Sequence, residues 1–136
     1  MRVVLDTNVL LVSLPPLSRY HPIFKAFVQN KFTLLLSNEI YLEYLEIIAQ
    51  KASPFVAARF TEFIYKQENL EVVTIYYQWN LIIQDGDDNK FSDCAIAAKA
   101  DYLVTNDTHF NVLKKIEFPK IRLVTIDEFL KLVEPL

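Results

Sequence analysis

Five short apolar runs alternate with stretches of helical periodicity, and this alternation constrains the fold more than any other feature of the sequence. A strand followed by a helix and then by another strand is typical of βαβ units, which pack around a parallel sheet. We therefore predict an α/β fold, a three-layer sandwich with a mainly parallel central sheet of about five strands. The predicted strands are residues 2–5, 32–36, 71–75, 102–105 and 121–124.

Prolines and capping residues predict where the helices between these strands begin. Pro22 suits the first turn of one helix. Ser37 and Ser53 suit the N-caps of two more helices, which should reach about residues 50 and 68. Further helices are predicted over the apolar residues 76–83, over 91–98 after a turn at Gly86, directly after Asp107, and from the capping box Thr125–Glu128 to Val133.

The composition favours one soluble domain. The chain has 136 residues, of which 52% are hydrophobic, so it can bury a substantial core. Its single cysteine, Cys94, excludes an intramolecular disulfide and is expected to be a small buried hydrophobe. Asp6 interrupts the first apolar run, which is not typical of a signal peptide, and no run approaches the roughly 18 apolar residues of a membrane span. We expect residues 1–136 to form a single cytoplasmic domain without membrane contact.

The acidity of the chain is concentrated between Asp85 and Asp107. That segment contains six aspartates and two lysines, a net charge of −4, whereas the whole chain carries −3. Clustered carboxylates repel one another unless a cation lies between them. The mild overall acidity argues against a broad basic face for nucleic acid, but not against a nuclease whose carboxylates hold a metal ion.

Asp6 and Asp107 each follow a predicted strand, at the edge where open α/β sheets bind their ligands. Either carboxylate could instead cap the helix that follows it, and spacing alone favours neither interpretation. Because two separate strands end in this way, a shared site becomes the better hypothesis.

Three further acids have simple structural interpretations. Glu43 lies on a polar helix face, for which solvation is the simpler explanation. Asp93 lies on the polar side of its helix, where exposure and a role in a site are equally good interpretations. Asp88, beside Asp87, could complement a helix dipole, and Lys90 could offset the local repulsion.

Together these residues resemble the PIN-domain ribonucleases, the fold of many toxins from bacterial toxin–antitoxin pairs. The resemblance runs nearly end to end, and its sheet order would be 3-2-1-4-5. The segment Asp85–Asp88 is similar to a variant in some PIN subfamilies, where the second acid of the doublet also faces the site. The four motifs that carry the resemblance are Leu5–Asn8, Ser37–Glu43, Asp93–Ala98 and Thr105–Asp107.

The resemblance implies a metal-dependent endoribonuclease that hydrolyses single-stranded or loop RNA and leaves a 5′-phosphate. Hard carboxylate ligands suit Mg²⁺ or Mn²⁺. For the third ligand, Asp88 and Asp93 both remain candidates, and we favour Asp93. The site would then comprise Asp6 and Asp107 as leading ligands, Glu43 and Asp93 completing the ring, Asp88 as a further ligand, and Asn8 and Thr105 orienting the ligands.

The implied partners are an RNA substrate, a cognate antitoxin protein and a second copy of the chain. The aromatic-rich helices over residues 22–30 and 54–68 have apolar surface that a homodimer would cover.

Other functions fit less well. A haloacid-dehalogenase-type phosphatase would need an aspartate where Asn8 stands, and a receiver domain would need a lysine where Thr125 stands. The main alternative is a PIN-fold protein-binding module with little or no catalysis. His21 and His109 are expected to be exposed to solvent, and the tyrosines and Trp79 are expected to lie in the core rather than to stack on bases.

Overall fold

The computed structural model describes residues 1–134 and contains one parallel sheet. The strand order is β3-β2-β1-β4-β5, which confirms the predicted fold class and topology. The strands are β1 (Arg2–Leu5), β2 (Thr33–Leu36), β3 (Leu70–Val72), β4 (Tyr102–Val104) and β5 (Leu123–Val124).

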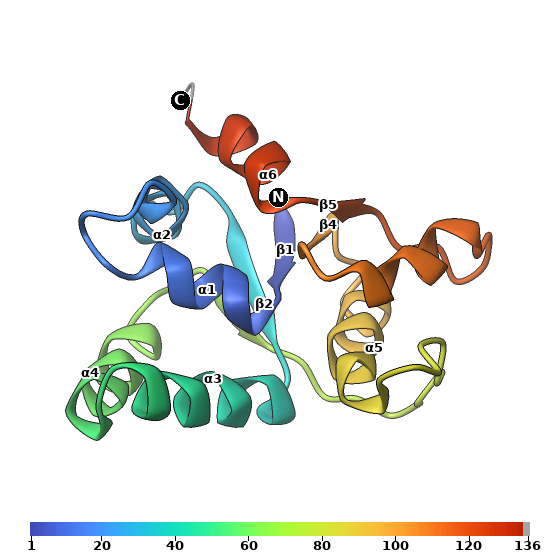
Figure 1. The fold of residues 1–136 in the computed structure, drawn as a ribbon, viewed down its shortest axis with the longest axis horizontal. Helices are drawn as coiled ribbons and strands as arrows, with labels where there is room; N and C mark the ends of the chain where they lie inside the picture. Colours follow the sequence, from blue (N-terminus) through green and yellow to red (C-terminus); the bar gives the residue numbers. More distant parts are fainter. Residues whose placement is uncertain (135–136) are drawn as a thin grey trace.

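Helices cover both faces of this sheet (Figure 1). In that view α1 to α4 lie on the left of β1 and β2, and α5 lies on the right. Two 3₁₀ helices, η1 and η2, precede α5 and follow β4. The elements are α1 (Thr7–Ser13), α2 (His21–Val28), α3 (Asn38–Lys51), α4 (Pro54–Ile64), η1 (Gly86–Asp88), α5 (Asn89–Ala97), η2 (Thr108–Lys115) and α6 (Ile126–Val133).

The caps predicted from the sequence are present. Ser37 Oγ accepts a hydrogen bond from Ile40 N at 3.3 Å, and Ser53 Oγ accepts one from Val56 N at 3.1 Å. Thr125 begins α6 with both hydrogen bonds of a capping box. Each cap satisfies backbone N–H groups that have no partner within their own helix.

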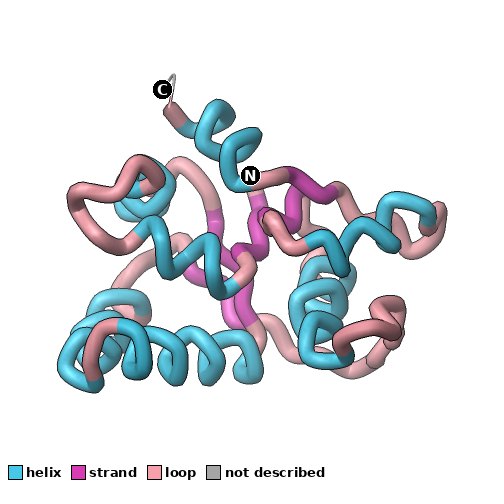
Figure 2. Tube along the Cα trace, viewed as in Figure 1, coloured by secondary structure: helices cyan, strands magenta, loops and turns pink. Residues whose placement is uncertain are grey.

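The segment between β3 and η1 is the largest departure from the predicted elements. Residues 76–83 form no helix but run as a loop (Figure 2). The side-chain amide of Asn89 explains part of this, because it donates to Ile82 O and its Oδ1 accepts from Ile82 N, both at 2.9 Å. These bonds satisfy backbone groups that a helix would otherwise satisfy. Two smaller corrections are that α4 ends at Ile64, not near residue 68, and that β3 is Leu70–Val72, not residues 71–75.

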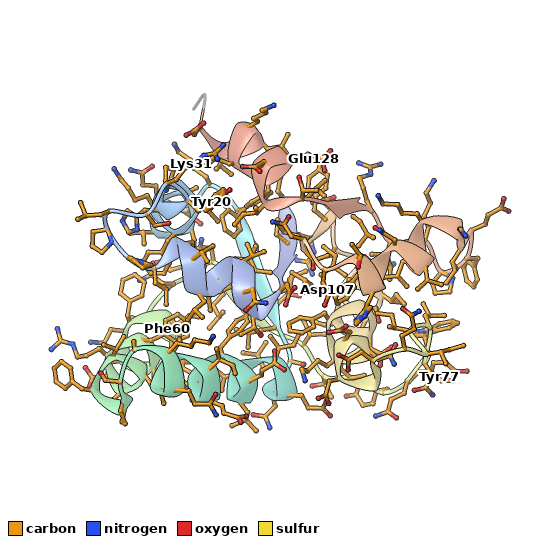
Figure 3. The ribbon with its side chains drawn as sticks, in the orientation of Figure 1. Tyr20, Lys31, Phe60, Tyr77, Asp107 and Glu128 are labelled. Carbon is orange, nitrogen blue, oxygen red and sulfur yellow. The ribbon has the colours of Figure 1, made fainter. Side chains whose placement is uncertain are left out.

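Exposed aromatic rings accompany this loop. Tyr76 is 92% exposed, and Tyr77, labelled at the lower right of Figure 3, is 65% exposed. The expectation that the tyrosines lie in the core is therefore wrong for these two residues and for Tyr65, which is 53% exposed. Cys94, by contrast, is fully buried as expected, and burial raises the pKa of its thiol to about 12. Within residues 1–134, no helix has both the length and the apolar character needed to cross a bilayer.

Candidate metal centre

The parallel pairing of β1 with β4 brings Asp6 and Asp107 to the same edge of the sheet. Leu5 is in register with Val104, and Asp6 N donates to Val104 O at 3.0 Å. Thr105 lies between the two acids: its hydroxyl donates to Asp6 Oδ2 at 2.7 Å, and its Oγ1 accepts from Asp107 N at 3.0 Å. Thr105 thus has the contacts of the orienting residue that was predicted.

Asp6 is 8% exposed and occupies the N-cap position of α1 without a side-chain capping hydrogen bond. Burial raises the pKa of its carboxyl group, and the charges of Asp107 and Glu43 raise it further, although the hydrogen bond from Thr105 opposes this shift. A purely structural carboxylate is normally compensated by a cation or by several donors. Burial and repulsion together therefore favour a binding role for Asp6 over an N-cap role.

Asp107 has the N-cap role that was one of its two interpretations from the sequence. Its Oδ1 accepts a hydrogen bond from His109 N at 2.9 Å, so it caps η2. The same oxygen lies 3.5 Å from His109 Nδ1. In Figure 3, Asp107 lies between α1 and α5.

Asp88 lies at the junction of η1 and α5 and faces the same acids. Its Oδ2 is buried and has no hydrogen-bond partner within the described residues. Burial raises the pKa of Asp88 to about 6, with further contributions from the charges of Asp85, Asp107 and Asp6, while His109 opposes the shift. A ligand atom from each of Asp85, Asp88 and His109 lies within 4.8 Å of the other two, which is the spacing of side chains around one metal ion.

Glu43 joins the site through hydrogen bonds rather than as a free carboxylate. Lys90 Nζ lies 2.9 Å from its Oε1, and the Thr7 hydroxyl donates to its Oε2. Burial lowers the pKa of Lys90, but the hydrogen bond and charge of Glu43 outweigh burial, so the net shift is upward and the ammonium group stays charged. Glu43 is thus paired, and the solvated-face interpretation is wrong for this position.

Asp93, which we favoured over Asp88, faces a different part of the surface. Its Oδ1 accepts a hydrogen bond from Trp79 N at 3.1 Å, and it lines a hollow together with Glu39 and Lys90. Burial raises its pKa, and the nearby charge of Glu39 adds to the shift. Asp88 lies in η1, before α5 begins, and its Oδ2 faces His109, whereas Asp93 lies within α5 and contacts Trp79, so the two side chains point to different neighbours. Asp93 is 5% exposed, which also rules out simple solvation.

Asn8 is exposed on α1 and borders a hollow that also contains Asp6, Tyr20 and Asp107. Asp107 is near enough for its charge to raise the pKa of both Asp6 and Asp88, the charge of Asp6 also raises the pKa of Asp88, and His109 lies near both Asp88 and Asp107. The three side chains whose ligand atoms lie within 4.8 Å of one another are Asp85, Asp88 and His109. Glu43 contacts Lys90 and Thr7, and Thr105 contacts Asp6. Asp93 is not part of this group.

His109 and Asp85 are the residues of this cluster that sequence reasoning did not assign to it. His109 is only partly exposed, at 43% of its side chain, and its Nδ1 is buried without a hydrogen-bond partner in the described chain. Two signals could have indicated it: His109 follows Asp107 by two residues, and a capped turn returns such a side chain toward the capping carboxylate.

Comparisons with known proteins show the family and the fold of this chain. A family model described as "PIN domain" matches residues 2–109. The chain belongs to the PIN-domain family, a family of nucleases. No protein matches in a search of curated proteins.

Several solved structures share the fold. The chain is similar to VapBC2 from Rickettsia felis, crystallised with a DNA fragment from its promoter, with a TM-score of 0.62 and 18% identity over 92% of this chain and 98% of that one. It is equally similar to VapBC-1 from nontypeable Haemophilus influenzae, with a TM-score of 0.62 and 16% identity over 93% and 99%. The PIN domain of human SMG5 matches with a TM-score of 0.56 and 10% identity over 97% and 98%.

Proposed function

We propose that this chain is an Mg²⁺- or Mn²⁺-dependent endoribonuclease whose site is formed by Asp6, Asp88 and Asp107, with Glu43 in support. The observation that carries the proposal is the buried Asp88 Oδ2, which has no hydrogen-bond partner among residues 1–134 and lies near the charges of Asp85, Asp107 and Asp6. Leaving a buried polar atom unpaired costs about 1–3 kcal/mol, so such an atom in a native fold calls for an explanation. A divalent cation would supply the missing partner and offset the repulsion between the carboxylates.

The donor set fits this group of ions. Oxygen atoms from carboxylates suit Mg²⁺ and Mn²⁺, which keep part of their water shell when bound. Asp6, Asp88 and Asp107 would hold the ion, and Thr105 would fix the orientation of Asp6 through the 2.7 Å hydrogen bond. When bound, such an ion neutralises phosphodiester charge and activates the attacking water.

The chain's own residues supply the remaining requirements of hydrolysis. Water attacks the phosphorus atom, the bond to the 3′ oxygen breaks, and the products carry a 5′-phosphate and a 3′-hydroxyl group. The Lys90 ammonium group is held by Glu43 beside the acids and provides a fixed positive charge for the phosphate. Asn8 borders the open hollow next to Asp6 and Asp107, where the RNA backbone would enter.

We further propose that the protein is the cytoplasmic toxin of a toxin–antitoxin pair, that its nuclease domain spans residues 1–136, and that it forms a homodimer. The family membership and the two VapBC structures support the toxin assignment. Exposed apolar side chains on α2 and α4, including Val28, Phe55 and Val56, offer surface for a second copy or for an antitoxin. Solution mass measured alone and with the candidate antitoxin tests both contacts.

The nuclease proposal is tested with a pair of substitutions, one at Asp88 directly before α5 and one at Asp93 within it. Asp88→Asn should lower the rate of single-stranded RNA cleavage in Mn²⁺ by about a hundredfold or more, because a site ligand is lost. Asp93→Asn is the matched control, since it changes the same chemical group within α5, and it should change the rate less than about threefold. Cleavage products on a denaturing gel give the rates, and Asp6→Asn should behave like Asp88→Asn.

Two results would contradict the proposal. If Asp93→Asn abolishes cleavage while Asp88→Asn does not, the ligand set is wrong. If the wild type and Asp6→Asn are equally inert across RNA substrates while a partner protein co-purifies with both, the protein-binding function is correct.

A further inference from the structure

We propose that His109 is a direct ligand of the divalent ion, through Nδ1, and that this imidazole makes the site prefer Mn²⁺ over Mg²⁺. The proposal rests on the nuclease function proposed above, which supplies the divalent ion. It adds one nitrogen ligand to carboxylate ligands that all bind through oxygen. The residues that carry it are Asp88, Asp107 and His109, which we call the His109 corner.

The distances in the His109 corner suit a shared ion better than direct hydrogen bonds. His109 Nδ1 lies 3.6 Å from Asp88 Oδ2 and 3.5 Å from Asp107 Oδ1. Hydrogen bonds between a ring nitrogen and a carboxylate are shorter than about 3.2 Å. Adjacent ligand atoms around an octahedral ion with bonds of about 2.1 Å lie roughly 3 Å apart. A contraction of about half an ångström in each of these two separations would therefore bring His109 Nδ1 to ligand spacing from both carboxylates.

The unpaired atoms point to the same conclusion. Among residues 1–134, two buried side-chain N or O atoms have no hydrogen-bond partner, and they are Asp88 Oδ2 and His109 Nδ1, which face each other. Two facing buried atoms that each lack a hydrogen-bond partner call for an explanation, and a third atom bound between them, an ion in our proposal, supplies one. The second histidine of the chain shows the contrast, because His21 Nδ1 lies 2.9 Å from Ser13 O and is satisfied.

The local backbone explains why His109 reaches the site. Asp107 caps η2 by accepting a hydrogen bond from the backbone N–H of His109 at 2.9 Å. This turn holds the start of η2 against the carboxyl end of β4, so the imidazole lies beside Asp107 and opposite Asp88. A side chain held in this way is already placed for binding and loses little conformational freedom when the ion arrives.

An imidazole ligand changes which ion the site selects. Mg²⁺ favours carboxylate, carbonyl and water oxygens and gives up its water reluctantly. Mn²⁺ shares the preference for oxygen, but it belongs to the first-row transition series whose members bind sites that contain nitrogen, although it binds them least tightly of the series. Nδ1 therefore adds more to the affinity for Mn²⁺ than to the affinity for Mg²⁺. A carboxylate at the same position would favour both ions more evenly.

Pulsed electron paramagnetic resonance on the Mn²⁺-loaded full chain tests the proposal directly. Wild type should show modulation from a directly bound nitrogen, and labelling the histidines with ¹⁵N should change its frequency. His21→Gln is the matched control and should keep the signal, whereas His109→Ala should lose it. Because the wild-type labelling experiment needs no variant, misfolding of His109→Ala would not prevent the test.

Calorimetric titration with each ion gives the selectivity. His109→Ala should weaken Mn²⁺ binding by about tenfold or more and Mg²⁺ binding by less than about threefold. His109→Asp should bind both ions but lose the nitrogen signal and most of the preference for Mn²⁺. This second variant separates loss of the ligand from general damage to the site.

The outcomes distinguish this proposal from the nuclease proposal. If Mn²⁺ binds in a manner that depends on Asp6 and Asp88 but shows no nitrogen coupling, the role of His109 is overturned and the nuclease proposal stands. If the wild type binds neither ion, both proposals fail. Equal loss of Mn²⁺ and Mg²⁺ affinity in His109→Ala would overturn the selectivity that we assign to the imidazole.

Discussion

Charged side chains lie at both ends of β1, and they differ in their neighbours: the one at the amino end is paired with an opposite charge, whereas the one at the carboxyl end lies near like charges. At the amino end, Arg2 makes two hydrogen bonds with the Glu71 carboxylate, at 2.8 and 2.6 Å, and two more with Ala98 O, while its backbone N–H donates to Asp101. At the carboxyl end, Asp6 accepts from the Thr105 hydroxyl and faces the charges of Asp107 and Glu43.

The pKa shifts express this difference. The hydrogen bond between Arg2 and Glu71 raises the pKa of the guanidinium and lowers that of the carboxylate, so each charge stabilises the other. Burial and neighbouring acids raise the pKa of Asp6, so its charge is disfavoured in the fold. Arg2 is therefore paired within the fold, whereas Asp6, the residue directly after the same strand, faces other acids. By our proposal a divalent cation offsets that repulsion.

The largest expected effect is the increase in the free energy of unfolding when Mn²⁺ binds. With free Mn²⁺ at about a hundred times its dissociation constant, the free energy of unfolding should rise by about 2.7 kcal/mol, because the ion binds the native state. Arg2→Met should keep this increment and Asp6→Asn should lose it. Thermal unfolding of each variant with Mn²⁺ and with EDTA measures the increment. An equal increment in the two variants would show that Asp6 contributes no more to binding of the ion than Arg2 does.

A second, smaller effect is expected at the amino end. Arg2→Met should lower the free energy of unfolding by about 1–2 kcal/mol, mainly because Ala98 O loses its donors. The ion pair itself contributes little, since the two side chains are 39% and 45% exposed and water screens them. Urea unfolding in EDTA measures the change. Glu71→Gln completes a double-mutant cycle, and the paired interpretation is wrong if that cycle shows no coupling.

Much of the fold could be predicted because its signals are local. Apolar runs, the caps at Ser37 and Ser53, and the capping box at Thr125 each depend on a few neighbouring residues. The segment 76–83 shows where local signals fail. Its apolar content indicated a helix, but its backbone instead forms hydrogen bonds with the side chains of Asn89 and Asp93, which lie further along the chain.

The site could be predicted in part for a related reason. Asp6 and Asp107 follow strands, so the topology of the sheet is enough to bring them together. The choice between Asp88 and Asp93 depends on where α5 begins and on its rotation about its axis, which a pattern of apolar residues defines only coarsely. The position of His109 depends on a turn that forms only when Asp107 caps η2, and no spacing rule used for the sequence includes that contact.

The smallest expected effect is a dependence of stability on pH through Asp88, which, like Asp6, lies near other acids. Its pKa is about 6 in the fold and about 4 in an unfolded chain, so between these values the folded state binds more protons. Stability in EDTA should therefore fall as the pH rises from about 4 to 6 and then change no further through this group. Solvent screening reduces the loss to about 1 kcal/mol, and Asp88→Asn should remove it.

The measurement is the difference in free energy of unfolding between wild type and Asp88→Asn at pH 4.5 and pH 7. A difference that does not change with pH would mean that Asp88 is compensated within the chain, as Arg2 is, and needs no cation.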